Sequence, residues 1–212
     1  GAFAGSGTTY TASITPSAAG PVTVSVAANV AADAASNGNT ASNILSRTYD
    51  NVAPTVVISS TATDPTNVSP IPVTITFSES VTGFIVGDIT VTNGTSSAFA
   101  GSGTTYTASI TPSATGPVTV SIAANVAVDV TSNGNTASNI LSRTYDNVAP
   151  SVVITSTATE PTNVSPIPVT ITFSESVTGF VLGDITVTNG TASSFAGSGT
   201  TYTANITPTA VG

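Results

Sequence analysis

The stretch "TYTASI" at Thr105–Ile110 alternates polar and apolar residues one for one. Successive side chains of a strand point to opposite faces, so this pattern is typical of a strand with one buried face. The same alternation occurs in "VTITF" at 73–77 and "VTVSI" at 118–122. No window shows a helical stripe, and Thr and Val pack better on a pleated surface than in a helix. The sequence therefore predicts an all-β fold.

The chain repeats itself. The nonapeptide "FAGSGTTYT" begins at Phe3, at Phe99 and at Phe195, so the repeat length is 96 residues and the 212 residues hold just over two periods. A period of about 100 residues is the size of a β-sandwich domain and is far longer than a solenoid or propeller repeat. Each repeat is therefore expected to have its own core.

Turn-forming stretches such as "DPTNVSP" at 64–70 and "SNGN" at 132–135 separate the apolar runs. The complete repeat is predicted to contain seven strands, at residues 55–60, 71–78, 88–93, 96–100, 104–111, 117–127 and 137–145. Seven short strands in such a repeat predict tandem immunoglobulin-like antiparallel β-sandwiches. Phe77, Phe84 and Phe99 are expected in the core, with Tyr106 half-buried on the sheet.

The repeats divide the chain into three parts. Residues 1–50 form the C-terminal part of one repeat, 51–146 a complete repeat, and 147–212 the N-terminal part of a third. Neither partial sandwich is expected to be stable alone, because each exposes a core face and unpaired strand edges. We favour the interpretation that they are a window on a longer array of neighbouring repeats. The alternative is that the two ends complete each other between copies, forming a fibre by strand complementation.

Composition restricts the function. The chain has no Cys, Met, Trp, His or Lys, two Arg residues and a formal net charge of -8. So few basic groups argue against a nucleic-acid partner, and catalysis by His or Cys is excluded by absence. The absence of Cys together with abundant Thr, Ser and Asn fits an oxidising exterior. No apolar run is long enough to span a membrane, so no membrane insertion of this segment is expected.

One longer motif resembles a known family. The stretch "FSESVTGFIVGDITVTNG" at 77–94, followed by "FAGSGTTYTASITP" and "SNGNTAS", resembles the bacterial Ig-like repeats of large repetitive surface proteins and adhesins. The resemblance covers the whole chain and consists of strand and turn residues, so it is more specific for the fold than for an activity. It implies a secreted, multi-repeat stalk or filament segment, located extracellularly or at the cell surface. From the residues themselves we expect no enzymatic activity.

The acidic residues are predicted to gather at the ends of the sandwich. Because antiparallel strands alternate in direction, each loop is assigned to one end of the domain. Asp50 in the linker, Glu79 after the second strand, Asp88 before the third and Asp129 before the last all fall at the end where the chain enters. Asp64 falls at the end where the chain leaves, facing Asp146.

The set recurs one repeat later as Asp146, Glu175 and Asp184. Carboxylates close together raise one another's pKa and weaken a joint unless a cation lies between them. Calcium suits this chemistry because it takes 6 to 8 oxygen ligands in loose geometry, whereas zinc and copper favour the absent His and Cys. Calcium is therefore the predicted cofactor at these eight residues. The alternative is that the acids only solvate loop tips and favour turns.

Three classes of function follow. The first is a structural array whose joints are stiffened by calcium. The second is a glycan- or protein-binding module, which would need an exposed aromatic cluster or a diverged loop that these near-identical repeats do not offer. The third is hydrolysis with the carboxylates as acid and base, which is the least favoured because no pocket is implied.

Overall fold

The computed structural model describes residues 2–209. Contacts between residues divide the chain into two compact units, Gly1–Asp146 and Asn147–Gly212. Among the described residues the regular structure is β-strand apart from two short 3₁₀ helices. None of the helices in residues 2–209 has the length and apolar character needed to cross a membrane.

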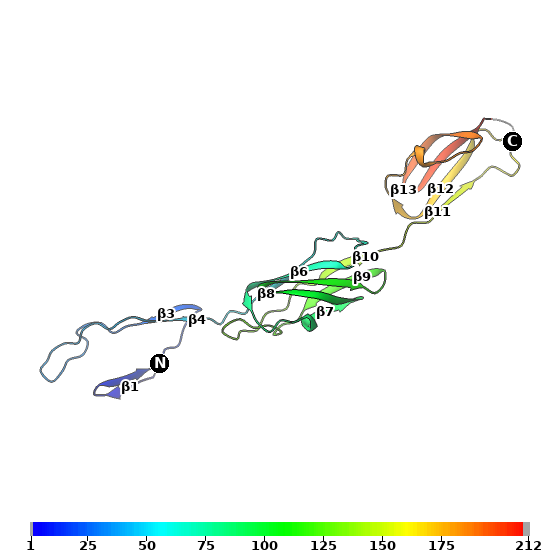
Figure 1. Ribbon diagram of the computed structural model, residues 1–212. Coiled ribbons are helices and arrows are strands. Elements are labelled where there is room, and N and C mark those ends of the chain that lie inside the picture. The colour runs from blue at the N-terminus through cyan, green and yellow to red at the C-terminus, as the bar shows by residue number, and fades with distance from the viewer. Residues whose placement is uncertain (1, 210–212) are drawn as a thin grey trace. The chain divides into compact units, whose positions relative to one another are not determined.

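The complete repeat in the first unit is a sandwich of two antiparallel sheets (Figure 1). One sheet has the order β5-β6-β8, with bounds Val56–Ser59, Ile71–Val81 and Gly94–Pro112. The other has the order β10-β9-β7, with bounds Leu141–Tyr145, Gly116–Ile122 and Ile89–Thr92, and the 3₁₀ helix η1 (Val86–Asp88) precedes β7. This division of strands is that of a constant-type immunoglobulin domain. The predicted fold class is confirmed.

Strand β8 is a hairpin that replaces two predicted strands. Its N-terminal and C-terminal arms lie side by side. The close approach is seen at Gly94, where an added Cβ would lie 2.9 Å from the carbonyl oxygen of Thr111. At the turn, a Cβ added to Gly101 would lie 2.3 Å from the carbonyl oxygen of Thr105, and Gly101 has a φ of +116°. Only glycine fits this close approach. The predicted strands 96–100 and 104–111 are thus the two arms of β8.

The core forms where the alternating faces of the two sheets meet. Ile75 of β6 pairs with Tyr106 of β8, and both side chains are buried. Phe77 packs edge-on against Phe84 and Tyr106, with ring centroids 5.2 and 5.9 Å away, while Phe99 stacks on Tyr106 at 5.6 Å. The prediction is confirmed for Phe77 and Phe84, which are buried, whereas Phe99 is half-buried and packs against the core. Tyr106 is more deeply buried than expected.

Two predicted strands are too long. Strand β9, predicted at 117–127, ends at Ile122, and strand β10, predicted at 137–145, begins only at Leu141. The intervening residues form a loop because Asn125 and Ser132 have positive φ values of 62° and 71°, which a strand does not accommodate. This loop, residues 123–140, is called the β9–β10 loop below.

The partial repeat before the sandwich forms two small ladders. Strands β1 (Phe3–Ser6) and β2 (Thr9–Ala12) make a hairpin, and β3 (Gly20–Val24) pairs with β4 (Leu45–Tyr49). Their side chains are mostly exposed. These ladders correspond to β8, β9 and β10 of the complete repeat, 96 residues later.

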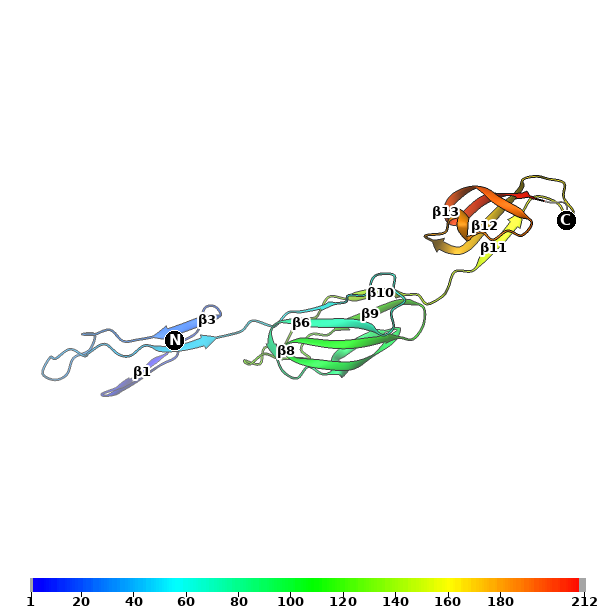
Figure 2. The ribbon, with the colours of Figure 1, turned by 45° about the horizontal axis from the view of Figure 1, so that its top comes forward.

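The second unit is built around one sheet. Strands β11 (Val152–Ser156), β12 (Ile167–Val177) and β13 (Gly190–Pro208) lie in this order, with the 3₁₀ helix η2 (Leu182–Asp184) before β13 (Figure 2). The registers repeat those of β5, β6 and β8. Its buried apolar cluster is small and consists of Ile171, Tyr202 and Ala204.

Candidate metal site

Three carboxylates from distant parts of the sequence meet in the first unit. They are Asp50 in the linker between β4 and β5, Glu79 near the end of β6, and Asp129 in the β9–β10 loop. Their candidate ligand atoms all lie within 4.8 Å of one another. Asp129 is buried, and Asp50 and Glu79 are half-buried. These three residues are called the acidic triad below.

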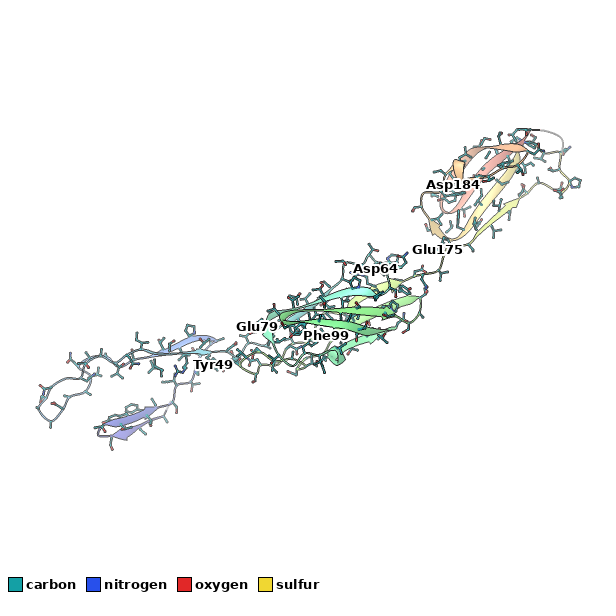
Figure 3. The ribbon with its side chains drawn as sticks, in the orientation of Figure 1. Tyr49, Asp64, Glu79, Phe99, Glu175 and Asp184 are labelled. Atoms are coloured by element: carbon teal, nitrogen blue, oxygen red, sulfur yellow. The ribbon has the colours of Figure 1, made fainter. Side chains whose placement is uncertain are left out.

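Pairing between loops brings Asp129 to the end of β6. Thr82, just after β6, and Val128 exchange two main-chain hydrogen bonds of 2.8 and 3.0 Å. The pairing of β6 with β8 is also irregular between Thr76 and Val81, so the backbone bends where Glu79 lies. Figure 3 shows Glu79 and Asp64 at opposite ends of this domain.

Asp129 organises a tight turn through its carboxylate. Its Oδ1 accepts hydrogen bonds from the main-chain N–H groups of Thr131 (2.8 Å) and Asn133 (2.9 Å) and from the Thr131 hydroxyl (3.0 Å). Its Oδ2 accepts one, from Asn133 Nδ2 at 2.8 Å. Asp33, one repeat earlier, accepts equivalent bonds from Ala35 and Asn37. The turn is therefore encoded locally, in both repeats.

Asn135 holds the β9–β10 loop from within. Its Oδ1 accepts hydrogen bonds from the main-chain N–H groups of Val126 (3.0 Å) and Ala127 (2.8 Å). Its Nδ2 donates to the carbonyl oxygens of Ala123 (2.9 Å) and Thr136 (2.8 Å). The Asn135 side chain is 1% exposed, and it makes the hydrogen bonds to these main-chain groups that a neighbouring strand would otherwise make. The sequence predicted a turn at 132–135 but did not reveal this role of Asn135, whose only signal is the recurrence of "SNGN" at 36–39 and 132–135.

The linker is attached to the same loop. Asp50 Oδ1 accepts a hydrogen bond of 3.0 Å from the main-chain N–H of Val52, and the carbonyl oxygen of Asp50 accepts one of 3.4 Å from Asn133 Nδ2. Asn133 therefore connects Asp129 with the linker. The arrangement directs a carbonyl oxygen as well as three carboxylates to this end of the domain.

The triad carries unbalanced negative charge. Burial raises the pKa of Glu79 above its usual value, and the charges of Asp50 and Asp129 raise that pKa further. Burial acts in the same direction on the pKa of Asp129, but the hydrogen bonds from Asn133 and Thr131 outweigh it and lower that pKa below its usual value. The turn therefore favours the ionised form of Asp129, whereas burial and the two neighbouring charges disfavour the ionised form of Glu79.

This asymmetry predicts the pH dependence of stability in a chelator. Glu79 has a raised folded pKa, so its contribution is present below its unfolded value of about 4.3 and is lost as the pH rises through the folded value. Asp129 has a lowered folded pKa, so its contribution is present above about 3.9 and is lost as the pH falls through the folded value. Glu79→Gln should remove the first dependence and leave the second, as measured by calorimetric melting against pH. A Glu79→Gln profile parallel to that of the parent above about pH 4.3 would contradict this assignment.

The other predicted acids do not join the triad. Asp88 and Asp184 accept hydrogen bonds from the main-chain N–H groups of Ile85 (2.8 Å) and Val181 (2.9 Å), beside their 3₁₀ helices. Asp64 Oδ1 accepts one of 2.7 Å from the N–H of Thr144 and so attaches its loop to β10. Asp146 ends the first unit, and Glu175 lies half-buried in β12 of the second. Within residues 2–209 the triad is the only group of three or more candidate metal ligands found.

The fold defines the class of this protein as an immunoglobulin-like β-sandwich. The family described as "Bacterial Ig-like domain" matches residues 50–145 and again residues 146–211. These matches cover more than half of the chain, which therefore belongs to the bacterial Ig-like domain family. The resemblance predicted from the sequence is confirmed. A search of curated proteins gave no match to the chain.

Proposed function

We propose that the chain is a structural segment of a bacterial surface protein or adhesin, part of an extracellular stalk or filament, and that calcium at the acidic triad stiffens its linker. The family and the near-identical repeats support a structural surface protein. The single observation that supports calcium is that one carboxylate oxygen from each of Asp50, Glu79 and Asp129 lies within 4.8 Å of the other two. Under the same proposal the segment has no enzymatic activity.

The donor set fits a hard cation. Calcium takes oxygen ligands from carboxylates, carbonyls and water. Asp129 Oδ1 already accepts three hydrogen bonds, whereas Oδ2 accepts one, so Oδ2 retains the greater capacity to bind a cation. The carboxylates of Asp50 and Glu79 and the carbonyl oxygen of Asp50 supply further oxygens at the same end of the domain.

Calcium bound to the triad would join three parts of the fold. Asp50 belongs to the linker, Glu79 to the β5-β6-β8 sheet, and Asp129 to the loop that follows β9 of the other sheet. A cation bound to all three would neutralise the repulsion among the carboxylates, which adds to burial in raising the pKa of Glu79. Movement of the linker relative to the domain would then require breaking metal–oxygen contacts. This restriction would stiffen the array.

Calcium should raise the melting temperature of the complete repeat. At free calcium a hundredfold above its dissociation constant, binding adds about 2.7 kcal/mol, which is a shift of roughly 10–20 °C for a domain of this size. Calorimetry of the full chain in calcium and in chelator measures the shift. Glu79→Gln should melt at a higher temperature than the parent in chelator, because it relieves the repulsion within the triad, and it should lose most of the calcium shift.

Asp64→Asn is the matched control, because it removes the same charge at the other end of the domain and its amide oxygen can still accept the Thr144 hydrogen bond. This variant should keep the calcium shift of the parent. An equal shift in the parent, Glu79→Gln and Asp129→Asn proteins would remove the triad from the proposal. If calcium has no effect on the melting of the folded chain, the acidic residues serve only to solvate the ends of the domain and the structural role stands without calcium.

A further inference from the structure

Two segments of the complete repeat, residues 54–66 and residues 136–146, are joined along their length and are together called the seam below. The first segment contains β5, at the edge of one sheet, and the second contains β10, at the edge of the other. Just before β10, Asn139 accepts a hydrogen bond of 2.8 Å at Oδ1 from the N–H of Ile58 and donates one of 3.0 Å from Nδ2 to the Ile58 carbonyl oxygen. One side chain thus bonds both main-chain groups of a β5 residue.

Arg143 of β10 continues the seam beyond the end of β5. Its Nε donates a hydrogen bond of 2.9 Å to the carbonyl oxygen of Ala62, and its Nη2 donates one of 3.3 Å to the carbonyl oxygen of Ser60. The Arg143 side chain is half-buried. Hydrogen bonds from a charged donor are stronger than those between neutral groups, so this side chain is a firm connection between the two segments.

Main-chain hydrogen bonds close the seam at both of its ends. At its beginning the N–H of Thr136 donates to the carbonyl oxygen of Pro54 at 2.9 Å. At its end the N–H of Thr66 donates to the carbonyl oxygen of Thr144, and the N–H of Asp146 donates to the carbonyl oxygen of Thr66, both at 2.9 Å. The last residue of the first unit is therefore bonded directly to the seam.

The two segments of the seam run in the same direction. The hydrogen-bonded residues are 81 positions apart at Ile58 and 80 positions apart at Asp64. A separation that stays nearly constant along both segments is possible only for a parallel arrangement. The bridge between Thr66 and Tyr145 is likewise parallel.

This arrangement determines how the seam is loaded when the chain is pulled. The chain enters the complete repeat at Asp50, beside Glu79, and leaves it at Asp146, which bonds Thr66. Glu79 and Asp64 lie at opposite ends of the domain (Figure 3). Tension therefore pulls the first segment from one end and the second segment from the other. Parallel segments pulled in this way slide past each other, so their hydrogen bonds are strained together and not one after another.

We propose that the seam is the element that resists tension in this repeat, with Asn139 and Arg143 holding the entering and leaving segments together. The inference rests on the proposed function, because a stalk or filament is under tension along its chain. Each hydrogen bond alone is weak, and the resistance comes from loading them at the same time. Forced unfolding follows the rate of unfolding and not the equilibrium stability, so the contacts that must break first control it.

The direction of pulling tests the seam without changing any of its residues. The full chain has no cysteine, so paired cysteines can attach it to a force spectrometer. Val52→Cys with Val148→Cys loads the seam from its two ends, whereas Val52→Cys with Val130→Cys pulls both segments from the end where the chain enters. These three side chains are 55%, 63% and 94% exposed. In chelator, which removes any effect of calcium, the first pair should unfold at a several-fold higher force. Equal forces would overturn the proposal.

Asn139→Ala and Asn93→Ala are a matched pair of variants. Asn93 also bonds both main-chain groups of one residue, since it donates to the carbonyl oxygen of Ala114 at 2.8 Å and accepts from its N–H at 3.1 Å, but it lies outside the seam. With cysteines at 52 and 148, Asn139→Ala should lower the unfolding force clearly. Asn93→Ala should leave that force close to the parent value even where it lowers the melting temperature. Circular dichroism checks that both variants are folded, and an equal loss of force in the two would contradict the role of Asn139.

The outcomes distinguish this inference from the proposed function. Equal resistance in both pulling directions would remove the seam as the element that resists tension and would leave the surface-segment proposal standing. Location of the native protein inside the cell, measured by fractionation of cells with an antibody to the repeat, would overturn the stalk or filament. That result would leave the directional resistance of the domain unchanged.

Discussion

Replacing Phe77 with alanine should lower the free energy of unfolding of the complete repeat by about 3–5 kcal/mol, the largest effect expected of any single side chain here. Phe77 is 2% exposed and lies between the two sheets, in edge-on contact with Phe84 and Tyr106. Truncation removes the transfer free energy of the ring and leaves a cavity that the paired strands cannot close. Chemical denaturation followed by tyrosine fluorescence and circular dichroism measures the loss.

Phe173→Ala provides the comparison, because Phe173 makes the same ring contacts with Phe180 and Tyr202 in the second unit. Phe173 is only half-buried, so its removal should lower the stability of the second unit by well under the loss at Phe77. It should leave the unfolding of the complete repeat unchanged. Equal losses at the two positions would mean that the second unit already has a closed core.

The second large effect is expected at Asn135. Asn135→Ala should lower the free energy of unfolding by about 2–5 kcal/mol, because two main-chain N–H groups lose their partner: a buried one costs about 1–3 kcal/mol, and a half-buried one costs less. The donors affected are those of Val126 and Ala127. Since Asp129 lies in the same loop, the variant should also lose calcium-dependent melting even though every carboxylate is retained.

Asn39→Ala is the matched control. Asn39 makes the equivalent four hydrogen bonds in the first partial repeat. Because it lies outside the sandwich, this variant should leave both the unfolding free energy and the calcium shift of the complete repeat unchanged. Calorimetry of the two variants with and without calcium separates the effect of the loop from that of the charges. An Asn135→Ala protein as stable as the parent would mean that water replaces the amide.

Local sequence patterns predicted most of the strands. The period-2 alternation identified β6, β9 and the second arm of β8, and the turn residues separated them. The prediction of the end of β9 was wrong because a side chain, and not a neighbouring strand, bonds the main chain there. Residues 123–127 read as a strand continuation, but Asn135 supplies their hydrogen bonds and Asn125 takes a positive φ. That side chain is ten residues from Asn125, so the local pattern contains no sign of it.

The candidate site could be predicted in part. Alternating strand direction predicted that Asp50, Glu79, Asp88 and Asp129 share one end of the domain. The structure brings three of them within 4.8 Å of one another, while Asp88 accepts a hydrogen bond from Ile85. The choice among the four depends on the bend in β6 and on the pairing of Thr82 with Val128, 46 residues apart. Neither feature has a signature in the neighbouring residues.

By itself, the sequence determined the repeat length through its recurrence, and it determined most of the strands and the turn at 132–135 because these depend on residues a few positions apart. Tertiary structure alone decided which apolar strands are buried. Val120 is 3% exposed while Val24, in the same local sequence, is 37% exposed. The reason is physical: the pattern of a strand fixes which face is apolar, but that face is removed from water only when a second sheet packs on it.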